Sequence, residues 1–409
     1  MKLEYELGAS LQHSDNIRLR DTDKVGDTVL SPELNFNATQ DSSALQLALE
    51  GNLRYPHYLN GTYDDQLQGG LAGNATWKLL PERIDFIVSD VASRQRIDQF
   101  DSYTPDNQQQ VNVFTAGPSF RARFNEALGG TLDLRYTNTY AEESSEFGGD
   151  RYTAALALER LLGNGDTLTM HLDAMQTAND DAGAFYDYRR YDAFVGYGSQ
   201  LSRLRLDLEA GYSRIKPDNY RGDSSAPLLR ARLKWEIAPR STLGATLNHE
   251  FSDAANYLIQ QRGQSDGAIL ETPVDPSLGI GPQSFKQRHL SLSYAYEGER
   301  MNVQVSPYSD RLRYLAGNGL DQDVNALGVY LDYRLHPDLT LSLAGLYQKR
   351  EMDGIDRSDT SRSASVALTR QMSRKWYVRL AYQHSDRTTS GFTNDYTENS
   401  LTLSAAWRR

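Results

Sequence analysis

Apolar and polar residues alternate along most of this chain, in segments separated by turns rich in glycine, proline, asparagine and aspartate. One row of apolar positions is Leu71, Gly73, Ala75, Trp77 and Leu79, and the same rhythm returns in later segments up to the end of the chain. Successive side chains of an extended strand point to opposite faces. The pattern therefore predicts many strands, each with one apolar and one polar face.

The four tryptophans sharpen this prediction. Trp77, Trp235, Trp376 and Trp407 all fall on the apolar parity of their segments, and each lies next to a short turn rather than a long loop. An indole is apolar but carries an N–H that favours a wet partner, so tryptophan concentrates at membrane–water boundaries. We therefore predict an all-β fold, a transmembrane antiparallel up-and-down β-barrel, with these four side chains at one common height.

The order of the connections predicts the topology. Short turns and long polar loops alternate along residues 1–409, which we interpret as a single barrel domain of about 20 strands. Asp90 after Val88, and Pro307 and Ser309 further on, interrupt two apolar rows, so 18 strands remain open. In bacterial barrels short turns face the periplasm and long loops face outside. Both termini are then expected at the periplasmic end. A soluble β-sandwich also alternates, but its strands would not be this long or so free of charge on one face.

Composition agrees with a barrel. Mean hydropathy is −0.61, and no run reaches the roughly 18 apolar residues that a membrane helix needs. Cysteine is absent, which excludes disulfides and thiolate chemistry, and the formal net charge is −11, with acids crowded into loops. Basic residues are scattered, so we expect no nucleic-acid partner, and we expect neither a metal site nor a cofactor. The strand pattern begins at Leu3, from which we expect that a signal peptide has been removed.

The polar parity predicts the residues that face the interior. A barrel of this size leaves a water-filled lumen unless something plugs it. One interpretation is a solute path, since guanidinium groups suit anions and aromatic faces suit sugar rings. The other is a set of cross-strand ion pairs that only stiffen the wall. The candidate lumen residues are Arg54, Arg94, Arg121, Arg123, Arg135, Arg203, Arg205, Arg230, Arg232, Asp133, Asp207, Phe194, Tyr308, Tyr330 and Tyr377.

The longest connection, residues 252–285, contains several glycines and prolines together with Ile269 and Leu270. Loops of this length are usually functional or disordered. Because of its apolar content, we predict that this loop lies in or across the extracellular mouth as a constriction or lid. Surface disorder is the alternative.

Catalytic patterns are lacking. Neither G-x-S-x-G nor H-E-x-x-H occurs in the sequence. His249 lies beside Asn248 and near Ser252, but neighbouring strand residues point to opposite faces and could not act together. We predict that the protein is not an enzyme.

Two short stretches carry a family resemblance. Ser14-Asp15-Asn16-Ile17 after the first strand, and Leu30-Ser31-Pro32-Glu33-Leu34 opening the second, resemble the putative beta-barrel porin 2 group. The resemblance implies an outer-membrane barrel of Gram-negative bacteria associated with exopolysaccharide and PEP-CTERM loci. Such barrels usually end on an aromatic residue, whereas here Trp407 is followed by Arg408 and Arg409.

The sequence thus predicts an outer-membrane channel that exports a polar polymer, most simply an exopolysaccharide, from a periplasmic partner to the cell surface. The expected partners are outer-membrane lipid and lipopolysaccharide, the polysaccharide itself and a periplasmic export component. A diffusion porin for small polar solutes is one alternative. A polysaccharide-binding or structural barrel at the surface is another.

Overall fold

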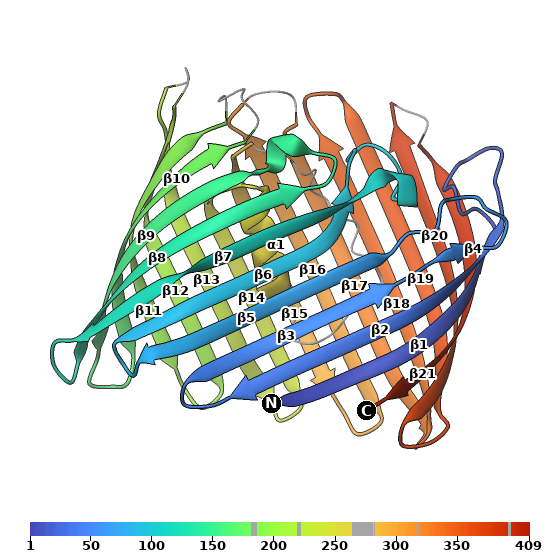
Figure 1. The fold of residues 1–409 in the computed structure, drawn as a ribbon, viewed down its shortest axis with the longest axis horizontal. Helices are drawn as coiled ribbons and strands as arrows, with labels where there is room; N and C mark the ends of the chain where they lie inside the picture. Colours follow the sequence, from blue (N-terminus) through green and yellow to red (C-terminus); the bar gives the residue numbers. More distant parts are fainter. Residues whose placement is uncertain (181–185, 219–221, 264–280, 282, 317–319, 392–393) are drawn as a thin grey trace.

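The computed structural model describes residues 1–180, 186–218, 222–263, 281, 283–316, 320–391 and 394–409. Within these residues the chain forms one antiparallel sheet of 21 strands, of which β4 has only two residues. The other 20 strands close into a barrel (Figure 1). The predicted fold class and strand number are therefore confirmed.

The strands are long and evenly spaced along the chain. They are β1 (Lys2–Ser14), β2 (Asp27–Asp41), β3 (Leu45–Arg54), β4 (His57–Tyr58), β5 (Gln68–Leu80), β6 (Ile84–Arg96), β7 (Gln108–Arg123), β8 (Leu128–Ala141), β9 (Gly149–Leu161), β10 (Thr167–Asn179), β11 (Tyr188–Gln200), β12 (Leu204–Pro217), β13 (Ser224–Ala238), β14 (Ser241–Ser252), β15 (Phe285–Glu297), β16 (Met301–Tyr314), β17 (Gln322–His336), β18 (Leu339–Met352), β19 (Arg357–Gln371), β20 (Trp376–Ser390) and β21 (Tyr396–Arg408). The helices are α1 (Ala254–Gly263) and two 3-10 turns, η1 (Pro105–Asn107) and η2 (Ser145–Phe147).

Each long strand pairs with its neighbour in sequence, and β1 closes the barrel by pairing with β21. Leu7 lies opposite Trp407 and Leu11 opposite Leu403 in this closing pair. Both termini lie at the end of the barrel that carries the short turns, at the bottom of Figure 1. We call this the short-turn end and the opposite one the long-loop end.

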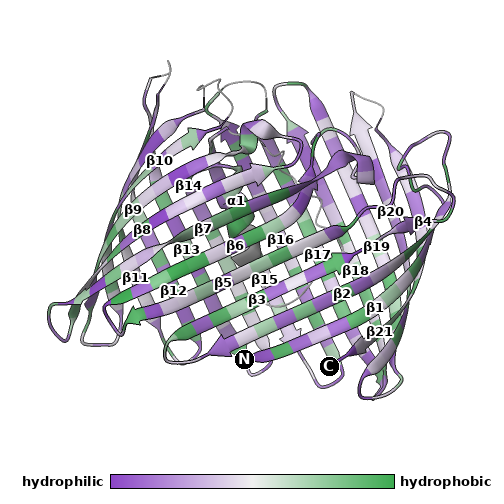
Figure 2. Cartoon of the chain, viewed as in Figure 1, coloured by the Kyte–Doolittle hydropathy of each residue, from purple (hydrophilic) through white to green (hydrophobic). Residues whose placement is uncertain are grey.

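The two faces of the wall follow the alternation in the sequence. Most residues on the outward parity are apolar, and many are exposed, for example Leu3 at 52%, Leu7 at 48% and Leu11 at 44%. Figure 2 shows the resulting alternation of hydrophobic and hydrophilic residues along the strands. A strand that faces lipid on one side and water on the other needs this pattern, because only alternate residues can be apolar.

Aromatic side chains lie on the outward parity near both ends. Trp77, Trp235 and Trp376 are about half exposed, and Trp376 lies directly opposite Trp407. Trp77, Trp235 and Trp376 are next to short turns, as predicted, whereas Trp407 lies at the same end of the barrel near the C-terminus. Exposed tyrosines occur on the same parity toward the long-loop end: Tyr55, Tyr140, Tyr152, Tyr191, Tyr212 and Tyr347. The outward face therefore carries an aromatic belt toward each end, as transmembrane barrels do.

Three short turns combine a shift in strand register with a proline. The strand register shifts between Lys78 and Leu80, between Glu236 and Ala238, and between Arg334 and His336. A proline follows directly in each case, at positions 81, 239 and 337. Proline has no N–H for the ladder, and a bulge adds one residue and a bend to a strand. The sequence thus ends the pairing and turns the chain at the same place.

The two strands whose apolar rows are interrupted keep their register. In β6, Trp77 pairs with Phe86 and Gly73 with Asp90, with no shift between them. In β16, pairing to β15 is missing around Pro307 but resumes in the same register. The 18-strand alternative is therefore wrong. Within the described residues, no helix is both long enough and apolar enough to cross a membrane.

Candidate functional site: the lumen and its narrowing at the long-loop end

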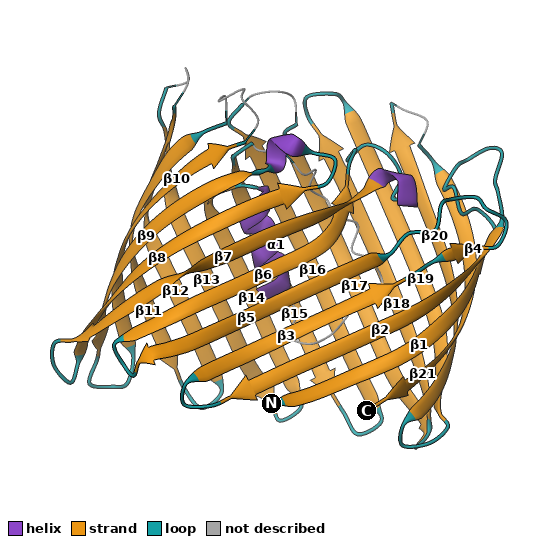
Figure 3. Ribbon diagram, in the orientation of Figure 1, coloured by secondary structure: helices purple, strands orange, loops and turns teal. Residues whose placement is uncertain are grey.

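Helix α1 lies inside the barrel and packs against its wall on two sides (Figure 3). Its first residues are buried among side chains of β7 and β8 on one side and of β15 and β16 on the other. The cluster comprises Val111, Val113, Ala141, Phe147, Ala254, Ala255, Tyr257, Leu258, Phe285 and Leu312. The wall residues of this cluster mark the inward face, and the registers extend that assignment to every long strand.

Asp253 fixes the start of α1 to the wall. One of its carboxylate oxygens accepts a hydrogen bond of 3.0 Å from the backbone N–H of Asn256, which caps the helix. Arg151 of β9 donates to both carboxylate oxygens at 2.7 Å, and the Tyr188 hydroxyl of β11 donates at 2.6 Å. Asp253 is only 1% exposed. A buried carboxylate needs such partners, since an unpaired charge away from water is costly.

Burial alone raises the pKa of the Asp253 carboxyl, but the Arg151 charge, its hydrogen bonds and those from Asn256 and Tyr188 outweigh burial. The net effect holds the pKa of Asp253 below its ordinary value of 3.8. The group is therefore an anion at neutral pH, and the anchor of α1 is an ion pair rather than a neutral hydrogen bond.

A second element also enters the barrel: the β6–β7 loop, residues 97–107. Asn107 holds its shape by accepting from the backbone N–H of Asp98 at 2.7 Å and donating to the carbonyl oxygens of Asp98 and Ser102. The loop then contacts β18, β19 and β20. Around the barrel, β5, β3, β2, β1 and β21 separate β6 from β20. The loop therefore crosses part of the lumen instead of following the rim.

Three inward arginines hold this loop by its backbone. Arg357 donates to the carbonyl oxygen of Phe100 at 2.6 Å, Arg387 to that of Asp101 at 3.2 Å, and Arg350 to that of Gln99 at 3.3 Å. These arginines are 2–4% exposed. The guanidinium of Arg357 also lies 5.4 Å from the centre of the Phe100 ring.

Asp359 balances two of these buried charges. Its carboxylate accepts from Arg357 at 2.9 Å and from Arg387 at 2.7 Å. Asn394 adds a further hydrogen bond of 2.9 Å to the Phe100 carbonyl. The loop is thus fixed by charge-assisted bonds, which are shorter and stronger than neutral ones.

A cavity of about 310 Å³ separates the two inward elements. Ile97 to Phe100 line one side of it, and Ala254, Phe285 and Tyr314 line the other. Two described elements therefore reduce the opening of the lumen at the long-loop end: a loop held by arginines and a helix held by Asp253.

Most of the predicted lumen residues lie on the inward face. Arg54, Arg121, Arg123, Arg135, Arg205, Arg230, Arg232, Asp133, Asp207, Phe194, Tyr308, Tyr330 and Tyr377 share the parity of the α1 cluster. Several of these arginines form ion pairs with acidic side chains of the wall. This agrees with the alternative interpretation, in which cross-strand ion pairs stiffen the wall. Arg54 lies 3.6 Å from Glu33, Arg135 lies 2.8 Å from Asp133, and Arg205 lies 3.2 Å from Asp207. Arg121 pairs with the buried Asp85.

Arg230 is the most constrained of the set. It bridges Glu209 at 2.8 Å and Glu250 at 2.5 Å, and its guanidinium lies 5.3 Å from the centre of the Phe194 ring. That ring is stacked on His171 at 4.5 Å. By contrast, Arg232 is exposed and makes no ion pair with any residue that the structure describes.

Two predicted lumen residues are corrected. Arg94 lies on the outward parity with Phe86 and Val88, because β6 keeps one register through Asp90. It donates to the Gln66 and Gln108 side chains near the long-loop end. Arg203 lies in the short turn before β12 begins at Leu204, so it is not on the wall. Parity counting fails in both cases, since it assumed a register change in the first and a longer strand in the second.

The structure describes only part of residues 252–285, for which the sequence predicts a role as a constriction or lid. Residues 253–259 lie inside the barrel as described above, while residues 264–280 and 282 fall outside the described part of the chain. The loop as a whole therefore stays a prediction. Sequence reasoning missed the β6–β7 loop and its arginines, although one signal was present: Arg350, Arg357 and Arg387 are inward residues at the long-loop ends of three successive strands.

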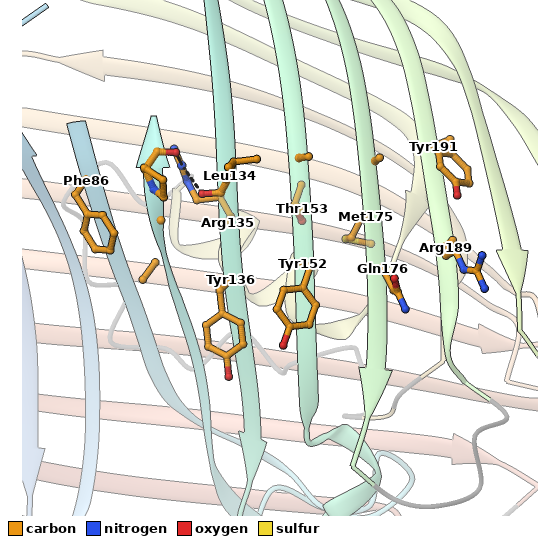
Figure 4. A pocket seen from close by; sticks show the side chains of 15 residues that line it. Phe86, Leu134, Arg135, Tyr136, Tyr152, Thr153, Met175, Gln176, Arg189 and Tyr191 are labelled. Carbon is orange, nitrogen blue, oxygen red and sulfur yellow. Dashed lines mark hydrogen bonds between the residues drawn. The ribbon is translucent and has the colours of Figure 1, made fainter. Parts of the chain in front are cut away.

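A larger cavity, of about 720 Å³, lies on the outer surface and is separate from the lumen (Figure 4). Phe86, Tyr136, Tyr152 and Tyr191 border it on the outward parity. Within the described residues, no group of histidine and acidic side chains is arranged to hold a metal ion.

The comparisons with known proteins agree with this architecture. A model of the family described as Putative beta-barrel porin 2 matches residues 321–409, which span β17 to β21. This is the family that the sequence resembles. The match confirms that resemblance over the last five strands of the barrel. None of the curated proteins matches the chain.

Solved structures of similar fold come from Pseudomonas aeruginosa. The ferric enterobactin receptor PfeA mutant R480A_Q482A has a TM-score of 0.53 and 10% identity, over 99% of this chain and 80% of that one. The Q482A mutant in complex with enterobactin has a TM-score of 0.52 and 11% identity, over 100% and 81%. At such low identity the likeness concerns the fold alone. That fold is the barrel of Gram-negative outer-membrane proteins.

Proposed function

We propose that this protein is an outer-membrane channel for polar solutes. The observation that carries the proposal is the closed 20-strand barrel with exposed apolar rows outside and charged or polar side chains inside. A barrel of 16–18 strands already leaves an aqueous channel. Among the described residues, α1 and the β6–β7 loop enter the barrel from its long-loop end.

For the cargo we propose a polar polymer, an exopolysaccharide strand passed from a periplasmic partner to the cell surface. The resemblance to barrels of exopolysaccharide loci supports this proposal. So does the wall: the guanidinium groups of Arg54, Arg135 and Arg205 are within 3.6 Å of acids, which leaves few strong anion sites. A moving polymer needs many weak contacts, because one tight site would trap it.

Diffusion of small polar solutes is the second candidate, and one observation favours it. The β6–β7 loop is held across part of the lumen by buried arginines, so the opening at the long-loop end is smaller than the barrel itself. Polymer export would then require this loop to be displaced or the strand to pass beside it.

Deleting the gene in the native host separates the two. Secreted polymer and uptake of small solutes are measured in the same strains. Loss of secreted polymer with normal uptake supports export, and normal secretion with slowed uptake supports the diffusion channel. Arg232→Ala and Tyr330→Ala alone should change secretion little, whereas both combined with Arg205→Ala should impair it, because a distributed path has no single essential contact.

A further inference from the structure

Four basic side chains meet on the outer surface of the barrel near the long-loop end, on β15 and β16. Lys286 lies directly opposite Arg313, and Arg288 directly opposite Arg311. All four are on the outward parity, since the inward residues between them are Phe285, Gln287, Asp310 and Leu312. Like charges directly opposite each other on one face of a sheet are destabilising. We call these four residues the outer basic patch.

Acids compensate only the β16 half of the patch. Arg311 lies 3.1 Å from Asp323, and Arg313 lies 2.7 Å from the same carboxylate and 3.3 Å from Asp353. Across the sheet, Lys286 and Arg288 have no acidic partner among the described residues, and Arg288 pairs in register with His249. The ammonium of Lys286 lies 5.7 Å from the centre of the Phe251 ring, which is buried against Ile215 and Ala226. Lys286 is therefore half-buried, whereas Arg288 is exposed. The β15 half is therefore a surface with an excess of positive charge.

Apolar side chains continue directly below the patch, toward the middle of the barrel. Leu247, Leu290 and Leu292 are 40–47% exposed on the same outward face. A ligand that satisfies this surface must carry a negative group at one end and hydrocarbon at the other. The basic residues lie closer to the long-loop end than the leucines do. The negative group of the ligand therefore lies toward the long-loop end and its hydrocarbon toward the middle of the barrel.

We propose that Lys286 and Arg288, completed by Arg311, bind the phosphate of a lipid A-type glycolipid whose acyl chains lie on Leu247, Leu290 and Leu292. This inference rests on the outer-membrane location proposed above, in which the long-loop end faces the outer leaflet. Guanidinium and ammonium groups are the usual partners of phosphate, Arg as a fork and Lys as a point charge. A phosphate between Arg288 and Arg311 turns their repulsion into two attractive contacts.

The test uses the full chain purified in detergent and native mass spectrometry with added diphosphorylated lipid A. Lys286→Gln together with Arg288→Gln should weaken lipid A binding about tenfold or more, since hydrogen bonds to charged groups are among the strongest. The matched control is Arg362→Gln, which removes an outward arginine that already pairs with Asp386 at 3.3 Å. Dephosphorylated lipid A should bind the parent as weakly as diphosphorylated lipid A binds the double variant.

Equal affinity of the parent and the double variant for lipid A would overturn the proposal, and so would equal binding of the dephosphorylated lipid. Single-channel conductance is measured on the same preparations. Conductance without selective lipid binding refutes the lipid site and leaves the channel standing. Selective lipid binding without conductance refutes the channel and leaves the lipid site standing. A heat-modifiable gel shift verifies that each variant is folded.

Discussion

Releasing the β6–β7 loop should widen the channel. The variant with Arg357→Ala and Arg387→Ala removes the 2.6 Å bond to Phe100 and the 3.2 Å bond to Asp101. A hydrogen bond from a charged donor contributes about 1.5–3 kcal/mol. The two together hold the loop by about 3–6 kcal/mol, while Asn394 and Arg350 still contact it at 2.9 and 3.3 Å.

A change of about 3 kcal/mol shifts the ratio of released to bound loop by roughly 100-fold. In planar bilayers the parent should show one dominant conductance level. The double variant should add a larger level with frequent transitions, because the remaining contacts no longer hold the loop in one place.

Two further variants control for effects other than release of the β6–β7 loop. The double variant leaves Asp359 buried without its cations, so Asp359→Asn is added in a triple variant that removes this charge. Arg362→Ala, on the outward face of the same strand β19, is the matched control and should leave conductance unchanged. If the triple variant and the parent have the same conductance level and the same noise, the loop does not narrow the channel.

Three other changes test the wall, the helix anchor and its ionisation. Leu343→Arg, on the outward face of β18, should cost about 2–4 kcal/mol of folding free energy in bilayers, measured by denaturant titration. Ala344→Arg, on the inward face next to it, should cost far less. Equal costs would mean that the face assignment is wrong. Asp253→Ala should detach the start of α1 and raise conductance. Because this change leaves Arg151 buried without its partner, it should also destabilise the fold by about 3–5 kcal/mol. An unchanged conductance would place α1 outside the conducting path. The pKa of Asp253 lies below 3.8, so its contribution to stability is complete above about that pH and falls only as the pH drops through the lower value in the folded state. The difference in unfolding free energy between the parent and Asp253→Asn should therefore be constant from neutral pH to about 4. A difference that already shrinks near pH 6 would contradict the ion pair.

The barrel could be predicted because its wall meets two different solvents. A strand between lipid and water must alternate. Positions such as Leu7 and Trp407 are apolar because they face lipid, and the positions that alternate with them along each strand are polar because they face the lumen. Register follows from this, because a slip by one residue would move every apolar side chain into the lumen. Arg94 was misplaced where that signal is weakest, beyond Asp90 on β6.

The narrowing could not be predicted in the same way. The carbonyls of Phe100 and Asp101 are bound by arginines more than 250 residues away in sequence, and loops carry no periodicity that would reveal such contacts. The length of the 252–285 connection drew attention to the correct end of the barrel. The shorter β6–β7 loop has no unusual composition, and only the three inward arginines on β18 to β20 pointed to it.

The charged groups at the two ends of the lumen do different work. Near the short-turn end, pairs such as Arg205 with Asp207 are 65% and 43% exposed, and exposed pairs contribute little. At the long-loop end, Arg357, Arg387 and Asp359 are buried, and breaking a buried pair is costly even where the intact pair adds little net stability. Such pairs fix geometry more than they stabilise the fold. Substitutions at the long-loop end should therefore change conductance, while single substitutions in the exposed pairs should leave it nearly unchanged.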